Sequence, residues 1–383
     1  MTRLETLLGP QGRELAQRLD QESITPATAL QVGTSLRAEF PAELVMDALT
    51  QHALRLQARD KFSRAGRMYF TRPGLEQASS ELVARHRAGR YGRSELVADL
   101  CCGIGGDLIA LAAGPRVRAV DLDPLHLRMA VANAAVYDVA EQVHAVRADV
   151  RDADLSGVDA VFVDPARRGG GRRFRTGDSE PPLEWCWELS TRIGAVGVKA
   201  APGLDRDQVP AGWEAEFVAV GKDLKEAMLW SPALATASRR ATILPAGHTL
   251  IPAPGPPVPV RAPGAFLCDP NPAVTRAGLV EELARELGAW KIDPQIAFLS
   301  SDAPLSTPFG RDLQVINSAP WNQKALPAVL RALDIGSVDI RRRGLAGDVD
   351  QLHRQLKLTG SRRATVVMTR VRNKPWGLVC LDQ

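Results

Sequence analysis

The stretch that decides the fold reads Val97-Ala98-Asp99-Leu100-Cys101-Cys102-Gly103-Ile104-Gly105-Gly106-Asp107, an apolar run followed by a glycine-rich turn. The apolar run predicts a buried strand, and the residues after the turn predict a helix. Gly103, Gly105 and Gly106 let the backbone turn tightly and approach a ligand without an intervening Cβ. The stretch therefore predicts a cradle for a nucleotide-like ligand at the carboxyl end of a parallel strand.

The residues around the turn distinguish between two such ligands. The dinucleotide fingerprint G-x-G-x-x-G needs a third glycine at position 108, where this chain has Leu108, and it brings a pyrophosphate to the start of the helix. A carboxylate at Asp107, which opens that helix, repels phosphate and suits a ligand with an ammonium group. NAD is therefore disfavoured, and S-adenosylmethionine, which carries an ammonium group, is favoured.

Three further apolar runs each lead into an aspartate at ordinary βαβ spacing: Val117–Val120 into Asp121, Val143–Ala148 into Asp149, and Val158–Val163 into Asp164. A carboxylate at the end of the second strand accepts both ribose hydroxyls of a nucleoside, and one at the end of the third accepts from an adenine amine. Aspartate is also a common helix N-cap, so a purely structural role is the alternative for each of them.

Four acid-terminated strands at this spacing resemble class I methyltransferases. The resemblance implies an α/β fold with a Rossmann-like sheet and an S-adenosylmethionine site along its carboxyl edge. The expected cofactor-binding residues are Asp99, Cys101, Gly103, Gly105, Gly106, Asp107, Asp121, Leu122, Asp149 and Val150.

Composition limits the remaining classes of protein. A chain of 383 residues is long for one core, so we expect two or three domains. The five cysteines and six histidines show no metal-ligand spacing, so we expect no metal site, and reduced thiols in a cytoplasmic protein. No stretch approaches roughly 18 uncharged apolar residues, so we expect no membrane segment.

Four parts follow one another along the chain. Residues 1–92 have apolar residues at three-to-four spacing and predict an N-terminal helical domain. Residues 93–245 alternate strand-like runs with helical stretches and predict the methyltransferase domain. Residues 246–264 are proline-rich and predict a semi-rigid linker, and residues 265–383 predict a small α/β domain.

Some elements of these parts are expected in particular forms. Trp213–Val220 and Ala241–Leu244 are candidates for an antiparallel edge of the methyltransferase sheet, with Gly221–Glu226 as a turn between them. Beyond the linker, Ala273–Leu287 is expected to be helical.

Asp164-Pro165-Ala166-Arg167 follows the fourth apolar run and carries the expected chemistry. Methyl transfer from a sulfonium depends mainly on in-line placement of donor and acceptor. Methyltransferases that act on exocyclic amines have (D/N/S)-P-P-(Y/F/W) here, whose first side chain points at the amine. This chain keeps Asp164 and Pro165, and has Arg167, which can stack on a base or bind phosphate, in place of the aromatic residue. We expect these three residues to be catalytic, with a nitrogen as the methyl acceptor.

Two basic stretches predict contacts with nucleic acid. Five arginines fall within residues 167–175, among three glycines and Phe174, which suits a phosphate clamp. Residues 321–383 contain twelve Lys or Arg against five Asp, a local excess of +7 where the whole chain has +4. A solvated basic surface is the alternative for both. The expected substrate or RNA-binding residues are Arg168, Arg172, Arg173, Lys199, Arg341, Arg342 and Arg343.

Two resemblances to known families add to these predictions. Residues 97–165, including Asn133-Ala134-Ala135-Val136-Tyr137, are similar to the trimethylguanosine synthase branch of RNA methyltransferases, which has a serine, two prolines and tryptophan where this chain has Asp164–Arg167. Nearly the whole chain resembles bacterial methyltransferases with a THUMP-like C-terminal domain, through Asp164–Arg168, Lys199–Gly203 and Ala273–Leu279. THUMP domains are associated with RNA binding, so the second resemblance implies an RNA partner.

The sequence thus predicts an S-adenosylmethionine-dependent methyltransferase that acts on a nitrogen of a base in structured RNA, such as tRNA or rRNA. Two alternatives remain at this point. One is a methyltransferase acting on a small molecule or a protein, and the other is a non-catalytic RNA-binding protein that retains the fold.

Overall fold

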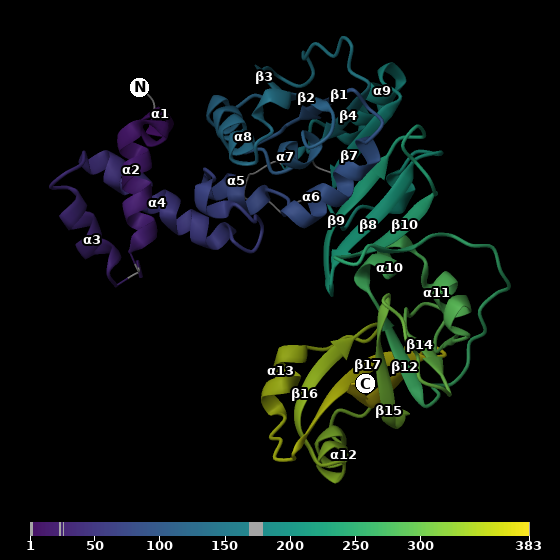
Figure 1. Cartoon of the computed structure of the whole chain (residues 1–383). Helices are drawn as coiled ribbons and strands as arrows, with labels where there is room; N and C mark the ends of the chain where they lie inside the picture. The colour runs from purple at the N-terminus through teal and green to yellow at the C-terminus, as the bar shows by residue number, and fades with distance from the viewer. Residues whose placement is uncertain (1–2, 23, 26, 168–178, 383) are drawn as a thin grey trace. The chain divides into compact units, whose positions relative to one another are not determined.

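The computed structural model describes residues 3–22, 24–25, 27–167 and 179–382, apart from the side chain of Arg167 (Figure 1). The chain divides into two compact units. The first comprises Met1–Ala200 with Leu229–Leu234, and the second comprises Ala201–Met228 with Ala235–Gln383. The four-part division along the chain, with its linker, remains a prediction.

The first unit begins with helices, as the apolar spacing predicts. Buried leucines from several of them form one cluster, which includes Leu15, Leu19 and Leu44. The helices are α1 (Arg3–Leu8), α2 (Pro10–Gln21), α3 (Ala29–Leu36), α4 (Ala42–Ala58), α5 (Arg72–Gln77) and α6 (Glu81–Ala88), with 3-10 turns η1 (Ala65–Arg67) and η2 (Gly89–Tyr91).

A parallel sheet fills the rest of the first unit. Its strands lie in the order β7-β4-β1-β2-β3, and every neighbouring pair is parallel, as the predicted fold requires. The strands are β1 (Leu96–Leu100), β2 (Arg116–Asp121), β3 (Val143–Arg147), β4 (Ala160–Val163) and β7 (Ala195–Ala200). The intervening elements are α7 (Leu108–Leu111), α8 (Pro124–Val136), η3 (Ala140–Gln142), the two-stranded ribbon β5 (Ala166–Arg167) and β6 (Ser179–Glu180), and α9 (Leu183–Arg192).

The second unit carries the remaining strands and helices. Its larger sheet has seven strands in the order β13-β14-β12-β15-β18-β17-β16, with buried clusters that include Leu313 and Val366. The elements of the unit are η4 (Arg206–Gln208), β8 (Glu214–Val220), β9 (Asp223–Trp230, which ends in the first unit), β10 (Arg239–Leu244), β11 (His248–Leu250), β12 (Phe266–Pro270), α10 (Pro272–Ala277), α11 (Val280–Leu287), β13 (Trp290–Lys291), β14 (Leu299–Ser301), β15 (Gly310–Pro320), α12 (Leu326–Ala332), β16 (Ile335–Arg342), α13 (Val349–Gln355), β17 (Arg362–Val371) and β18 (Lys374–Asp382).

Three local expectations are wrong. The expected antiparallel edge is not formed by β8 and β10, which pair in parallel, while β11 is the antiparallel neighbour of β10. The expected turn at Gly221–Glu226 is shorter, because β9 begins at Asp223 and this extra strand returns the chain so that β10 runs with β8. The expected helix Ala273–Leu287 is two helices, because Gly278 ends α10 in the left-handed conformation with φ 67°.

Candidate active site

The acidic residues of the four predicted strands gather at one edge of the first unit's sheet. β4, β1, β2 and β3 are parallel neighbours, so their carboxyl ends lie together. Asp99 lies in β1, Asp121 ends β2, and Asp164 follows β4 directly. The negative charges of Asp164 and Asp121 both raise the pKa of Asp99, so the three carboxyl groups lie within electrostatic range of one another.

Helix capping is the alternative role for the aspartates at this edge, and the structure bears on it for Asp164 and Asp149. Asp123 is the helix cap at this edge, since its side chain accepts from the backbone N–H groups of Leu125 and His126 at the start of α8. Asp164 is followed by the short strand β5 rather than by a helix, and Asp149 is followed by turns. Capping therefore explains neither Asp164 nor Asp149.

The glycine loop after β1 is fixed by backbone hydrogen bonds. The N–H groups of Cys101 and Cys102 both donate to the carbonyl of Val120, and Gly105 donates to Cys102. Cys101 and Gly103 have φ values of 64° and 53°, in the left-handed region that favours glycine. A Cβ built on Gly103 meets nothing within 4 Å, so open space lies beside the loop at this position.

Gly105 lies in a close packing contact with α8. Its φ is 87°, and a Cβ there would lie 3.0 Å from Cα of Ala130 in α8. The loop and α8 therefore approach each other closely because position 105 has no side chain. The neighbouring Gly106 similarly faces Cβ of Ala78 at 3.2 Å.

We expect Gly105→Ala to lower the free energy of unfolding by about 2 kcal/mol, because it adds left-handed strain to a close contact with α8. Gly114→Ala is the matched control, since a Cβ at Gly114 meets nothing within 4 Å. The measurement is urea unfolding of both variants and the parent protein. Equal stability of the two variants would contradict the packing role of Gly105.

Asp99 is a buried carboxylate that lacks a partner in the structure. It is 0% exposed, and neither of its side-chain oxygens has a hydrogen-bond partner among the residues that the structure describes. Burial, together with the negative charges of Asp164 and Asp121, raises the pKa of Asp99 to about 8, whereas Arg87 and Lys199 oppose the shift. An unsatisfied buried acid is costly unless a ligand pairs with it. A cationic group such as the ammonium of S-adenosylmethionine fits this requirement.

Asp121 holds the glycine loop. Its Oδ2 accepts from the N–H of Gly103 at 2.8 Å, and its Oδ1 accepts from the N–H of Asp123 at 2.8 Å. Each oxygen retains acceptor capacity for a hydroxyl group. Leu122 is next in the chain and is 64% exposed, which leaves an apolar side chain beside the carboxylate.

Asp149 is already paired. Its carboxylate accepts from the backbone N–H of Arg151 and from the Arg151 guanidinium at 2.9 and 2.7 Å, and these bonds hold the pKa of Asp149 at about 2. Arg151 also contacts Glu180 at 3.1 Å. Val150 beside it is buried. A ligand amine at Asp149 would therefore share an acceptor that Arg151 already uses.

Asp107 forms a buried ion pair that the sequence reasoning missed. Its partner is Arg87 from α6, which is 1% exposed. The Arg87 guanidinium also donates to the Ser79 hydroxyl and lies 4.9 Å from the ring centre of Phe162 in β4. The charge of Asp107 is thus balanced within the protein, and the ion pair joins α6 to the glycine loop, while a cofactor contact of Asp107 stays a prediction.

Asp164 and Lys199 meet at the ends of β4 and β7. Lys199 Nζ lies 2.8 Å from Asp164 Oδ2, with the two side chains 16% and 28% exposed. Pro165 is buried and biases Asp164 toward an extended backbone. The backbone of Arg167 pairs with Ser179 in the β5–β6 ribbon. Arg168, Arg172 and Arg173, like the side chain of Arg167, lie outside the described residues.

The three predicted arginines of the second unit make contacts within that unit. Arg343 contacts Asp269 at 2.8 Å, donates to the carbonyl of Ala297 and lies over the ring of Phe298. Arg342 donates to the carbonyl of Gly347, and Arg341 contacts Asp339 at 3.2 Å. The sequence around these arginines does not predict these partners.

Asn133 is a second residue whose role the sequence reasoning missed, although it belongs to the Asn133–Tyr137 segment. It is 0% exposed in α8. Its side chain accepts from the N–H of Tyr69 at 2.7 Å and donates to the carbonyls of Tyr69 and Ile104 at 3.0 and 2.9 Å. One amide therefore links the segment before α5, helix α8 and the glycine loop.

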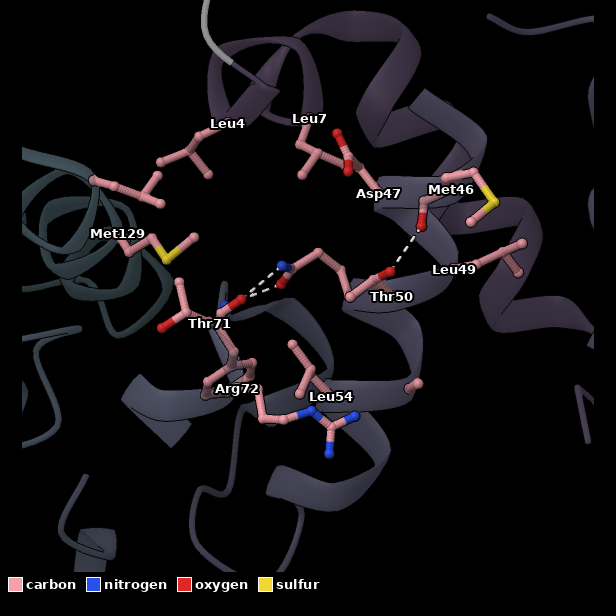
Figure 2. Close-up of a pocket in the computed structure, with 14 residues that line it drawn as sticks. Leu4, Leu7, Met46, Asp47, Leu49, Thr50, Leu54, Thr71, Arg72 and Met129 are labelled. Carbon is pink, nitrogen blue, oxygen red and sulfur yellow. Dashed lines mark hydrogen bonds between the residues drawn. The ribbon is translucent and has the colours of Figure 1, made fainter. Parts of the chain in front are cut away.

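The first unit also has an apolar pocket of about 500 Å³ (Figure 2). Leu4 and Leu7 of α1, Leu54 of α4 and Met129 of α8 contribute to its lining, as Figure 2 shows. Within it, Gln51 exchanges two hydrogen bonds with the backbone of Phe70, at 2.7 and 2.9 Å. The pocket lies between the N-terminal helices and α8, and the acidic residues of the sheet edge do not line it.

Two features are absent from the described part of the chain. Among those residues, no group of three or more His, Cys, Asp or Glu side chains is placed to hold a metal ion. No helix within the described ranges has the length and apolar character that crossing a bilayer requires.

Comparison with known proteins identifies the chain's relatives. An uncharacterized S-adenosylmethionine-dependent methyltransferase of Mycobacterium tuberculosis, found in strains CDC 1551 and H37Rv, is 40% identical over 315 residues, which cover 79% of this chain and 84% of the relative. The chain belongs to this methyltransferase family. The predicted enzyme class and the predicted cofactor, S-adenosylmethionine, are thereby confirmed.

Family models also match parts of this methyltransferase. The model for RNA cap guanine-N2 methyltransferases matches residues 94–176, the THUMP domain-like model matches residues 310–381, and a domain of unknown function matches residues 1–58. The crystal structure of a Porphyromonas gingivalis protein assigned as a methyltransferase is similar with a TM-score of 0.76 over 97% of both chains at 19% identity. The predicted class I fold, with a helical N-terminal part and a THUMP-like C-terminal part, is confirmed.

Proposed function

We propose that this methyltransferase methylates a nitrogen of a base in structured RNA, such as tRNA or rRNA. The observation that carries the proposal is Asp164, a partly exposed carboxylate at the acid-lined edge with one oxygen bonded to Lys199. Such an acceptor can orient an exocyclic amine for in-line transfer. The matches to an RNA methyltransferase model and to a THUMP-like model support RNA as the carrier of that amine.

Each residue proposed to hold the cofactor is assigned to one of the cofactor's chemical groups. Asp99 meets the ammonium group, the loop from Cys101 to Gly106 supplies backbone beside the methionine part, and Asp121 accepts from the ribose hydroxyls. Leu122, Asp149 and Val150 are proposed to surround the adenine. When bound, S-adenosylmethionine supplies a methyl group on a positively charged sulfur.

The proposed RNA contacts come from basic side chains. Arg167, Arg168, Arg172 and Arg173 are proposed to bind backbone phosphates beside the acceptor. In the second unit, Arg341, Arg342 and Arg343 are proposed to add positive charge, and their contacts within the unit would fix their positions. Binding that depends on these residues should weaken as salt rises. A cytoplasmic location fits an enzyme of RNA and is part of the same proposal.

The test uses the full chain with isotope-labelled S-adenosylmethionine and total RNA from a strain that lacks the gene. We expect label in RNA with the parent protein, and at least about a 100-fold slower rate with Asp164→Ala, because the amine loses its orienting acceptor. Calorimetry with S-adenosylhomocysteine should show unchanged cofactor affinity in this variant. Asp60→Ala, at an exposed acid after α4, is the control and should behave as the parent.

Two outcomes would contradict the proposal. Label that enters protein or small molecules and persists after ribonuclease treatment would favour another substrate class. A parent protein that binds S-adenosylhomocysteine and RNA without transferring label would indicate a non-catalytic RNA-binding role.

A further inference from the structure

Lys199 places a hydrogen-bond donor directly beside the Asp164 acceptor. The two residues lie at the carboxyl ends of the adjacent parallel strands β7 and β4. Lys199 Nζ donates to Asp164 Oδ2 at 2.8 Å, and among the described residues no hydrogen bond to Asp164 Oδ1 is formed, so that oxygen can accept one. An ammonium group has three N–H donors, so Lys199 retains donors as well. The pair therefore presents one acceptor and one cationic donor side by side.

The surroundings make this pair more than a surface ion pair. Both side chains are largely shielded from solvent, at 16% and 28% exposure. Asp99 and Asp164 lie close enough together for their charges to interact, and Lys199 acts on Asp99 in the opposite sense. The lysine is thus held at the acidic edge, where the proposed function places the methyl acceptor.

We propose that Lys199 and Asp164 together read the Watson–Crick edge of an adenine or a cytosine. This inference rests on the proposed function. In adenine the N6 amine lies beside the acceptor N1, and in cytosine the N4 amine lies beside the acceptor N3. Asp164 accepts from the amine while Lys199 donates to the ring nitrogen. On the same edge guanine presents the N2 amine beside N1–H, two adjacent donors, one of which would face the lysine cation.

The reaction on such a base balances with the groups present. The amine nitrogen forms a new N–CH₃ bond as the S–CH₃ bond of the sulfonium breaks, and the sulfur retains that electron pair. The nitrogen then gives up one proton to the Asp164 carboxylate, from which it passes to water. The products are S-adenosylhomocysteine and a base methylated on its exocyclic nitrogen.

The first experiment identifies the product by mass spectrometry of nucleosides from RNA methylated by the full-length protein. The inference predicts N6-methyladenosine or N4-methylcytidine. N2-methylguanosine as the product would overturn the inference and leave the proposed function standing. An absence of any methylated nucleoside would contradict the proposed function itself, and the inference would fall with it.

The second experiment tests whether Lys199 contacts the ring nitrogen. Synthetic RNA containing the methylated site is compared with RNA in which that nitrogen is replaced by CH, as in 1-deazaadenosine or 3-deazacytidine. We expect the parent protein to be slowed about 10- to 100-fold by the replacement, and Lys199→Met to be slowed similarly on normal RNA but little further on the replaced base. Lys199→Arg should recover part of the rate.

If Lys199→Met and the replacement of the ring nitrogen each slowed the rate independently, so that their effects multiplied in combination, the proposed contact would be overturned. Cofactor affinity measured with S-adenosylhomocysteine separates a folding defect from a defect in base reading, since Lys199→Met should keep that affinity within about threefold. Lys222→Met, at an exposed lysine after β8, is the matched control and should leave both rates unchanged.

Discussion

Replacing Asp99 by asparagine should weaken cofactor binding about 30-fold or more while making the protein more stable at neutral pH. The carboxylate is fully buried and has no hydrogen-bond partner within the described ranges, so its negative charge is stabilised only when a cationic ligand is present. Loss of one buried charge-assisted contact costs about 2 kcal/mol or more, which weakens binding at least 30-fold by order of magnitude. Calorimetric titration with S-adenosylhomocysteine measures the loss.

The stability gain follows from the sign of the pKa shift. The pKa of Asp99 rises from 3.8 to about 8 on folding, because burial and two neighbouring acids disfavour its charged form. Below pH 3.8 the group is protonated in both states and has no effect. As the pH rises toward 8 the unfolded state is ionised while the folded state keeps its proton, so the group lowers stability.

Asp99→Asn lacks this dependence, and its advantage over the parent should grow by about 4 kcal/mol between pH 5 and pH 8. Urea unfolding across that range measures the difference. The affinity of the parent for a cationic ligand should rise over the same range, because binding expels the proton. Asp60→Asn should match the parent throughout, and a parent affinity that stays flat with pH would refute the assignment of Asp99.

Asn133→Ala should destabilise the protein by about 3 kcal/mol. It removes three hydrogen bonds in a site without solvent and leaves the backbone groups of Tyr69 and Ile104 unsatisfied. Because one of these groups belongs to the glycine loop, cofactor affinity should also fall, by about tenfold. Urea unfolding and titration with S-adenosylhomocysteine measure the two effects.

The matched control for Asn133 lies in the same helix. Val131 is 37% exposed, and Val131→Ala should change the free energy of unfolding by less than about 0.5 kcal/mol. If Asn133→Ala lowered stability but left cofactor affinity unchanged, the link between Asn133 and the loop would be structural only.

The sequence supports the fold well because its strongest signals are local. An apolar run followed by glycines and an aspartate specifies strand, turn and ligand edge within about a dozen residues. The predicted strands around Asp99, Asp121 and Asp164 accordingly appear as neighbours in the sheet. Strand β9 was missed because its charged start, Asp223 to Glu226, has the composition of a turn, whereas its buried end at Ala227–Trp230 decides the structure.

Most features of the site that escaped prediction depend on residues far apart in the chain, and one depends on a near neighbour. Asp107 was expected to face the ligand, and only the fold brings Arg87 of α6 against it. Asp149 was expected to have free acceptors, and Arg151, two residues later, bonds to its carboxylate. Arg343 belongs to a basic stretch that is typical of a nucleic-acid contact, whereas its pairing with Asp269 is set by the sheet of the second unit.

The amide of Asn133 has an implication for how this family diversifies. A side chain that bonds at once to Tyr69 and to Ile104 makes the helical segment part of the scaffold beneath the cofactor loop. Exchange of that segment alone would break these bonds. We expect relatives to retain the helical segment and the glycine loop together, with a substitution in one compensated by a substitution in the other.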